Sequence, residues 1–217
     1  IMAAHKVQTG ETLSFTAFVL TCLGQAVDSY PYMHAYRNWR NQLVLFDEVD
    51  VTTMIEVQAG DERYPLAHVI RAVNKRSFRD IHDEIRGHQA ARKQQPNPYQ
   101  RLIPLYTVVP GSIRRLAWRA IFRSPHLAKR NVGTTLLTAV GMFGEGAGWG
   151  ITMPLYTLGV TLGSIVHRPV LTGEQVENRE HLCITLSFDH DIVDGAPAAR
   201  FAQHLKGLLE RGHGLED

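Results

Sequence analysis

Acidic residues are missing from one long stretch of this 217-residue chain, because no Asp or Glu lies between positions 85 and 144. The net charge of the whole chain is only +2, so the acids are concentrated outside this stretch. A block of positive charge this long either faces phosphates, an acidic protein or an anionic membrane, or forms a solvated surface balanced by acids elsewhere in the fold. Both interpretations stay open. The basic residues of the block are Arg86, Arg92, Lys93, Arg101, Arg114, Arg115, Arg119, Arg123, Lys129 and Arg130.

Long apolar runs are also missing. Residues 13–23 and 151–166 are the longest apolar stretches, and Thr, Ser, Gly or Pro interrupts each of them. Both fall short of the roughly 20 apolar residues that a membrane-spanning helix needs, so no such helix is predicted. Residues 1–6 show neither the basic region nor the apolar core of a secretory signal. We therefore expect a cytoplasmic protein.

Cysteine is scarce, and the two cysteines, Cys22 and Cys183, lie far apart inside apolar segments. This spacing excludes the closely spaced cysteines of a zinc site or a redox pair, and we expect two buried thiols. The aromatic residues of the basic block are scattered and match no base-stacking motif, which argues against nucleic-acid binding. The length and a hydrophobic content of 44% fit one compact domain.

Two helices are predicted in the N-terminal half. Residues 12–30 have apolar side chains at helical spacing, with Ser14 as the expected N-cap. A second helix is expected to start at Ser77, because Ser77 and Asp80 resemble a capping box with a shorter acid. The prolines within residues 94–98 predict a loop after it.

Two further helices are predicted in the C-terminal half. Residues 112–123 have one apolar face and one basic face, a pattern that suits packing on the domain or lying on a membrane surface. The last helix is expected at residues 197–211. The basic face of the first of these helices consists of Arg114, Arg115, Arg119 and Arg123.

Short runs rich in β-branched and apolar residues predict strands between these helices. A hairpin-like turn is expected at residues 60–63, a second turn at 172–174, and a glycine-rich connection at 141–150. Strands and helices in one compact chain indicate an α/β fold. The predicted strands are residues 43–46, 49–57, 65–71, 134–140, 158–166 and 182–188.

A histidine stands between the last predicted strand and the last predicted helix, in the sequence S-F-D-H-D-I-V-D-G at residues 187–195. Loops held between regular elements commonly display catalytic groups. A lone histidine there is more often an ordinary polar residue, and H-x-x-x-D-G by itself occurs by chance. The rest of the chain therefore decides what His190 does.

Four segments carry motifs in a fixed order along the chain. Residues 186–199 contain S-F-D-H-x-x-x-D-G-A, residues 133–144 end in G-M-F-G, residues 69–78 read V-I-R-A-V-N-K-R-S-F, and residues 13–31 form the first long helix. Together they resemble the catalytic domain of the dihydrolipoamide acyltransferases of 2-oxo acid dehydrogenase complexes, within the chloramphenicol acetyltransferase-like superfamily. The resemblance covers nearly the whole chain.

The resemblance implies a fold, an assembly and a reaction. The fold is α/β, a chloramphenicol acetyltransferase-like mixed β-sheet sandwich with flanking helices, which forms homotrimers with active sites at the subunit interfaces and can build a larger cage. The implied reaction moves an acyl group between coenzyme A and a dihydrolipoyl or similar thiol. Coenzyme A or acyl-CoA is then a substrate, a partner domain carries the lipoyl group, and no metal takes part.

The resemblance also assigns roles to four residues. His190 matches the general base, and histidine as a residue type titrates near neutral pH, where such a base works. Asp194 matches a scaffold acid that shapes the His190 loop, and Gly195 matches a glycine that allows a tight turn into the last helix. Thr138 stands where the family has a serine that donates to the oxyanion of the tetrahedral intermediate, and threonine offers the same donor.

The chain departs from the family pattern in several places. Asp191 stands where the family usually has arginine, which reverses a charge beside His190 and casts doubt on the usual substrate. The I-N-P-P turn of the family survives only in part at residues 151–154, and the insert at residues 95–130 is longer and more basic than the family linker. We expect residues 1–217 to form a single catalytic domain whose N-terminal strand is missing, without lipoyl or subunit-binding domains.

Three functions remain as hypotheses. The first is acyl transfer between coenzyme A and a dihydrolipoyl thiol. The second keeps the chemistry and changes the acceptor to a free small molecule, which Asp191 and the absent lipoyl domain favour. The third is a structural trimer or cage protein without activity. The basic block could meet coenzyme A phosphates or an acidic partner domain.

Overall fold

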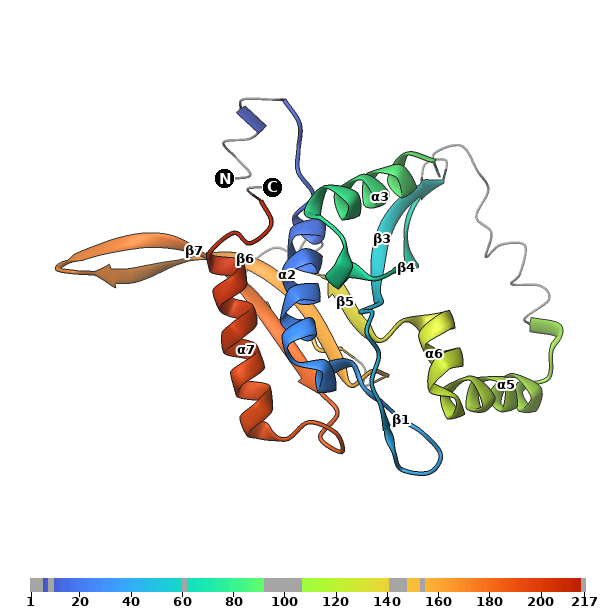
Figure 1. The fold of residues 1–217 in the computed structure, drawn as a ribbon. Coiled ribbons are helices and arrows are strands. Elements are labelled where there is room, and N and C mark those ends of the chain that lie inside the picture. The colour runs from blue at the N-terminus through green and yellow to red at the C-terminus, as the bar shows by residue number, and fades with distance from the viewer. Residues whose placement is uncertain are drawn as a thin grey trace.

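A mixed five-stranded sheet forms the centre of the computed structural model, which describes residues 6–7, 10–59, 62–91, 107–140, 148–152 and 155–215 (Figure 1). The strand order is β4-β3-β5-β6-β7. The two inner pairs, β3 with β5 and β5 with β6, are parallel, and the two outer pairs are antiparallel. The strands are β3 (Val51–Ala59), β4 (Glu62–Ile70), β5 (Thr135–Ala139), β6 (Leu158–Thr172) and β7 (Gln175–Phe188).

Three helices cover one face of this sheet, as Figure 1 shows: α2 (Phe15–Ser29), α3 (Phe78–Ala91) and α7 (Gly195–Glu210). Helix α2 contacts both α3 and α7 and is buried along nearly its whole length. The predicted mixed sheet with flanking helices is therefore confirmed. Two short 3-10 helices, η1 (Pro31–His34) and η2 (Val73–Lys75), follow α2 and β4.

The starts of α2 and α3 follow the predicted capping chemistry. The hydroxyl of Ser14 accepts a hydrogen bond from the backbone N–H of Ala17 at 3.2 Å, as an N-cap does. Ser77 and Asp80 exchange hydrogen bonds, each side chain accepting from the other residue's backbone N–H at 3.2 Å. Both predictions, the N-cap and the capping box, are confirmed.

The antiparallel hairpin of β6 and β7 is much longer than predicted. The pairing runs outwards from Leu158 and Phe188 to Thr172 and Gln175, whereas the sequence predicted strands only for residues 158–166 and 182–188. Figure 1 shows the outer part of this ribbon projecting from the body. Its side chains are mostly polar and exposed, so it lacks the apolar pattern by which strands were predicted, while the turn at Gly173 still brings the two backbones into register.

The region before β3 is less regular than predicted. A strand was expected at residues 43–46, but β2 (Leu43–Val44) is only two residues long and pairs with β1 (Tyr36–Arg37), which the sequence did not predict. Most side chains in this small hairpin point into solvent. Without a buried face, the sequence pattern carries little information about pairing.

Two helices precede β5. The predicted basic helix is α5 (Gly111–Arg123), and the unpredicted α6 (Pro125–Val132) follows it directly. A proline in the first turn suits the start of α6. Gly133 ends α6 with a φ of +71°, and a Cβ there would lie 2.8 Å from the carbonyl oxygen of Asp50. Glycine is therefore required where the chain turns from α6 into β5.

A buried carboxylate joins β3, β4 and α6. Asp50 is 3% exposed, and its side chain accepts from Arg71 Nη1 and from the backbone N–H of Ala72, each at 2.9 Å. The Arg71 guanidinium also donates to the carbonyl oxygens of Lys129 and Arg130 at the end of α6. The V-I-R segment that carries the family resemblance thus has a structural role, because it fixes the entry into β5.

Both cysteines are buried and free, as predicted. Burial raises the pKa of the Cys22 thiol to about 12, so this thiol stays protonated at neutral pH. Among the described residues, no helix has the length and apolar character needed to cross a membrane.

Candidate active site

His190 lies in a short loop between β7 and α7. The loop is held by its backbone: Asp189 N–H donates to the carbonyl oxygen of Thr157, and the N–H groups of Ile192 and Val193 donate to the carbonyl oxygen of Asp189. Val193 is buried and anchors the far side of the loop. The His190 side chain itself is 82% exposed. A fixed backbone therefore presents a solvent-accessible imidazole.

Asp194 connects this histidine to the start of α7. Its Oδ1 accepts from the N–H of Gly195 at 2.7 Å and lies 3.6 Å from His190 Nε2. The carboxylate thus sits at the positive end of the helix dipole, where an acid is favourable. The distance of 3.6 Å fits an ion pair and is too long for a hydrogen bond. The role of Asp194 as a scaffold acid that shapes the His190 loop stays a prediction.

Gly195 is the first residue of α7. Its φ is not positive, and a Cβ at this position would meet nothing within 4 Å. The backbone of this chain therefore does not need glycine for a tight turn, which was the role that the sequence analysis gave it. Open space around this position is available to a substrate or to another chain.

Asp191 has a partner that the sequence did not reveal. Arg37 of β1 donates from Nη2 to Asp191 Oδ2 at 3.1 Å, across an interval of 154 residues. Both side chains are largely exposed, so the pair adds little stability. It nevertheless neutralises the charge that departs from the family pattern, and it ties the histidine loop to β1.

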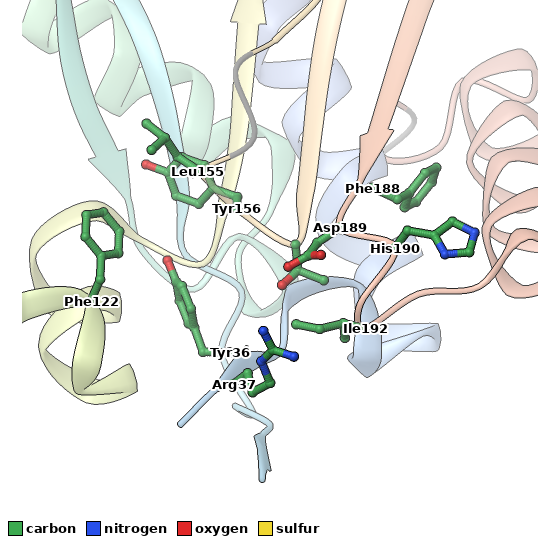
Figure 2. Close-up of a pocket in the computed structure, with 10 residues that line it drawn as sticks. Tyr36, Arg37, Phe122, Leu155, Tyr156, Phe188, Asp189, His190 and Ile192 are labelled. Atoms are coloured by element: carbon green, nitrogen blue, oxygen red, sulfur yellow. The ribbon is translucent and has the colours of Figure 1, made fainter. Parts of the chain in front are cut away.

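A cavity of about 410 Å³ opens beside the loop (Figure 2). Tyr36, Tyr156 and Phe122 form part of its wall, together with Asp189 and His190. In Figure 2 the imidazole points away from Tyr36 and towards the α7 side of the loop. The cavity therefore borders His190, while the ring itself is directed outwards.

The two tyrosines of this wall are structural. Tyr36 donates to the carbonyl oxygen of Gly133 at 2.9 Å, and Tyr156 donates to that of Val132 at 2.8 Å. Burial raises the pKa of both phenols, so they stay protonated. They join the cavity wall to the turn between α6 and β5.

Thr138 lies on β5, away from the histidine loop. Its neighbour Leu137 is fully buried against the helices, and because side chains alternate along a strand, Thr138 points to the opposite face of the sheet. In the register, Thr138 pairs with Thr161, which pairs with Thr185 on β7. Strand geometry then puts Thr138 roughly 15 Å from His190.

One chain therefore does not bring the predicted base and the predicted oxyanion donor together. His190 and Asp194 are close, but Thr138 lies two strands away from the strand that leads into the histidine loop. The placement of the active site between subunits, which the resemblance implies, stays a prediction. Residues 141–144 and 153–154, which the sequence analysis also singled out, lie outside the described residues.

The comparisons with known proteins agree with these motifs. Residues 111–215 match the family described as 2-oxoacid dehydrogenases acyltransferase (catalytic domain). A lipoamide acyltransferase component of a branched-chain alpha-keto acid dehydrogenase complex from Pseudomonas putida is 33% identical over 46% of this chain and 24% of its own length. A dihydrolipoyllysine-residue succinyltransferase from Staphylococcus saprophyticus is 24% identical over 97% of this chain and 42% of its own. The chain thus spans less than half of these relatives.

Solved structures share the fold. A dihydrolipoamide acetyltransferase from Azotobacter vinelandii aligns over 96% of this chain and 74% of its own, with a TM-score of 0.66 and 20% identity. A chloramphenicol acetyltransferase aligns over 96% of this chain and 82% of its own, with a TM-score of 0.56 and 16% identity. The predicted fold class is confirmed. Residues 111–215, just under half of the chain, are similar to the 2-oxoacid dehydrogenase acyltransferase catalytic domain.

Proposed function

We propose that this chain is a coenzyme A-dependent acyltransferase that moves an acyl group between coenzyme A and a dihydrolipoyl thiol carried by a partner domain. The observation that carries the proposal is the His190 loop. It presents an exposed imidazole next to the N-terminus of α7, inside the segment that matches the family. Both substrates are thiol carriers, so one base in one site serves both directions of the transfer.

The chemistry needs one base and one hydrogen-bond donor. His190 takes the proton from a dihydrolipoyl thiol, and the sulfur attacks the thioester carbonyl carbon of acyl-CoA. The carbonyl oxygen becomes an oxyanion, which the Thr138 hydroxyl stabilises by donating a hydrogen bond. When the bond to the coenzyme A sulfur breaks, the leaving sulfur takes the proton back from His190. The step balances without a metal ion or a redox cofactor.

A structural relative supports this assignment of residues. The Azotobacter vinelandii structure comes from an investigation of a serine, a histidine and an asparagine in the catalytic mechanism of that enzyme. The intervals between those three residues equal the intervals between Thr138, His190 and Asp194 here. Threonine keeps the hydroxyl of the serine, while Asp194 adds a negative charge where that enzyme has an amide.

We propose further that two copies of the chain complete each site, as in a homotrimer. His190 is exposed and directed outwards, and Thr138 lies roughly 15 Å away within the sheet. A donor must lie about 3 Å from the oxyanion to stabilise it. One chain cannot meet this requirement with both residues, but a neighbour that presents its Thr138 to His190 can.

The alternative function is acyl transfer to a free small molecule. Asp191 favours it, because this acid replaces the arginine of the family pattern. Arg37 neutralises Asp191 in the structure, however, so the reversed charge does not face the site alone. The pairing weakens the main argument for a different acceptor.

Measured acyl transfer to different acceptors tests the proposal. With acetyl-CoA or succinyl-CoA as donor, we expect faster transfer to dihydrolipoamide than to soluble amines or alcohols, including chloramphenicol. Exclusive transfer to an amine or alcohol would support the alternative function. If no acceptor is acylated and coenzyme A does not bind, both transfer functions are wrong, and the chain is a structural trimer or cage protein without activity.

Helix α5 is proposed as the docking face for an acidic partner domain. None of its residues is buried, and Arg115 and Arg119 are exposed. Reversing both charges, Arg115→Glu with Arg119→Glu, should weaken association with an acidic lipoyl-bearing domain by about tenfold at low ionic strength and remove most of its salt dependence. Turnover of free dihydrolipoamide should change little.

A matched control for this prediction is the pair Lys75→Glu with Lys206→Glu, which changes the net charge equally at exposed positions outside α5. Titration of the partner domain at several salt concentrations gives the comparison. Loss of turnover in the α5 variant would mean that this helix, whose Phe122 borders the cavity, contributes to the active site. Binding of anionic vesicles instead of the protein partner would identify a membrane-docking face.

A further inference from the structure

Two imidazoles and a carboxylate converge at the sheet edge opposite the histidine loop. His68 lies on β4, and Glu84 and His88 lie on α3. One potential ligand atom of each residue lies within 4.8 Å of the others. We propose that His68, Glu84 and His88 bind one divalent transition-metal ion, with Zn²⁺ as the best match to this donor set. The family resemblance implied no metal for this chain.

The fold explains why the three side chains meet. Glu84 and His88 are four residues apart and share one face of α3. That face also carries Ile81 and Ile85, which are buried against the sheet. On β4, His68 lies two residues from the buried Leu66 and two from the buried Ile70. Because every second side chain of a strand points to the same face, His68 points to the same side as they do. Figure 1 shows α3 lying across β3 and β4, which places the helix over this face.

Two neighbouring side chains orient the Glu84 carboxylate. Its Oε1 lies 2.8 Å from His68 Nε2, and its Oε2 pairs with the Arg76 guanidinium. A hydrogen bond to the non-ligating oxygen is typical support for a metal-bound carboxylate.

The distances suit a single small ion. The His68 and His88 ring centroids are 3.9 Å apart, with an angle of 45° between the rings. Donors bound to zinc at about 2 Å lie roughly 3 to 4 Å from one another, so small side-chain rotations bring these donors into range. Imidazole and carboxylate together suit Zn²⁺ better than Mg²⁺ or Ca²⁺, which prefer oxygen ligands. Three protein ligands leave a fourth position for water.

Other histidine–carboxylate pairs in the described part of the chain lack the third donor. His82 approaches Glu11 at 3.3 Å, and His167 approaches Glu180 at 3.9 Å, but only the His68 cluster meets the three-donor geometry among the described residues. The cluster links α3 to the edge strand β4, while His190 follows the other edge strand, β7. We therefore expect the ion to stabilise the α3–β4 contact without entering acyl transfer.

Metal binding to the untagged chain tests this inference. Isothermal titration with Zn²⁺ should show one ion per chain, and Zn²⁺ should raise the unfolding midpoint by several degrees, while Mg²⁺ should not. His88→Ala should weaken Zn²⁺ binding by at least roughly tenfold, and it leaves the pair of His68 and Glu84 in place. The matched control is His167→Ala, which removes an exposed histidine beside a carboxylate and should bind Zn²⁺ like the parent chain.

Cobalt gives a second measurement that does not depend on stability. Co²⁺ bound by these donors should show visible d–d absorption in the parent chain, and this absorption should be lost in His68→Gln. The inference is wrong if Zn²⁺ does not bind, if His88→Ala binds it as tightly as the parent, or if the cobalt spectrum survives in His68→Gln. None of these outcomes affects the proposed acyl transfer, which is measured by turnover.

Discussion

Replacing His190 by alanine is expected to lower acyl-transfer turnover by roughly 100-fold to 10,000-fold, the range that loss of a general base produces. The exposed imidazole is the base that we assign to the attacking thiol, and its loop is held by backbone hydrogen bonds that the substitution does not remove. The fold and coenzyme A binding should therefore be kept. Steady-state turnover with dihydrolipoamide and equilibrium binding of coenzyme A give the two measurements.

The matched control is His181→Ala, which removes an exposed histidine of β7 outside the loop. This variant should transfer acyl groups at the parent rate. The assignment of His190 as base is refuted if His190→Ala stays active towards every acceptor that the parent chain acylates.

Thr138→Val is expected to lower turnover by roughly 100-fold, because valine keeps the shape and deletes one oxyanion donor. Thr138→Ser should be nearly neutral, since the hydroxyl remains, and it serves as the matched control. Thr138 lies in the middle of the sheet, so thermal unfolding must be measured for each variant. Equal loss in the serine and valine variants would show that packing, and not the hydroxyl, matters at this position.

Combining the two substitutions tests whether both residues act in one site. Because His190 and Thr138 act on the same intermediate, the double variant should lose less than the product of the two single losses. Mixing His190→Ala chains with Thr138→Val chains before assembly should restore about a quarter of the parent activity, because a random trimer then contains some interfaces with both intact residues. If each chain used its own pair, mixing would restore nothing. Full activity of a stable monomer would contradict the proposed assembly.

Local patterns predicted most of the regular elements. Helices α2 and α3 begin at the predicted capping residues, because a cap depends on side chains within three positions of the helix start. The position of the His190 loop between a strand and a helix was also correct. The unpredicted β1 and α6 are short elements with few buried side chains, and apolar periodicity is weak in such segments.

The candidate site was only partly predictable. His190, Asp194 and Thr138 stand in motifs that resemble a known family, so their identities were accessible from the sequence. The ion pair of Arg37 with Asp191 was not, because 154 residues separate its partners. The contact between Asp50 and Arg71, which fixes the entry into β5, was not predictable either, because 21 residues separate these two partners.

The sequence by itself determined the types of most elements, their caps, and the loop that presents His190, since these depend on neighbours a few residues away. Only the tertiary structure decided which distant side chains meet: His68 with Glu84 across β4 and α3, and Arg37 with Asp191. It also decided that Thr138 points to the face of the sheet away from the helices, roughly 15 Å from His190. The physical reason is that strand order and register follow from the packing of the whole core, and a shift of one residue would exchange the two faces of a strand.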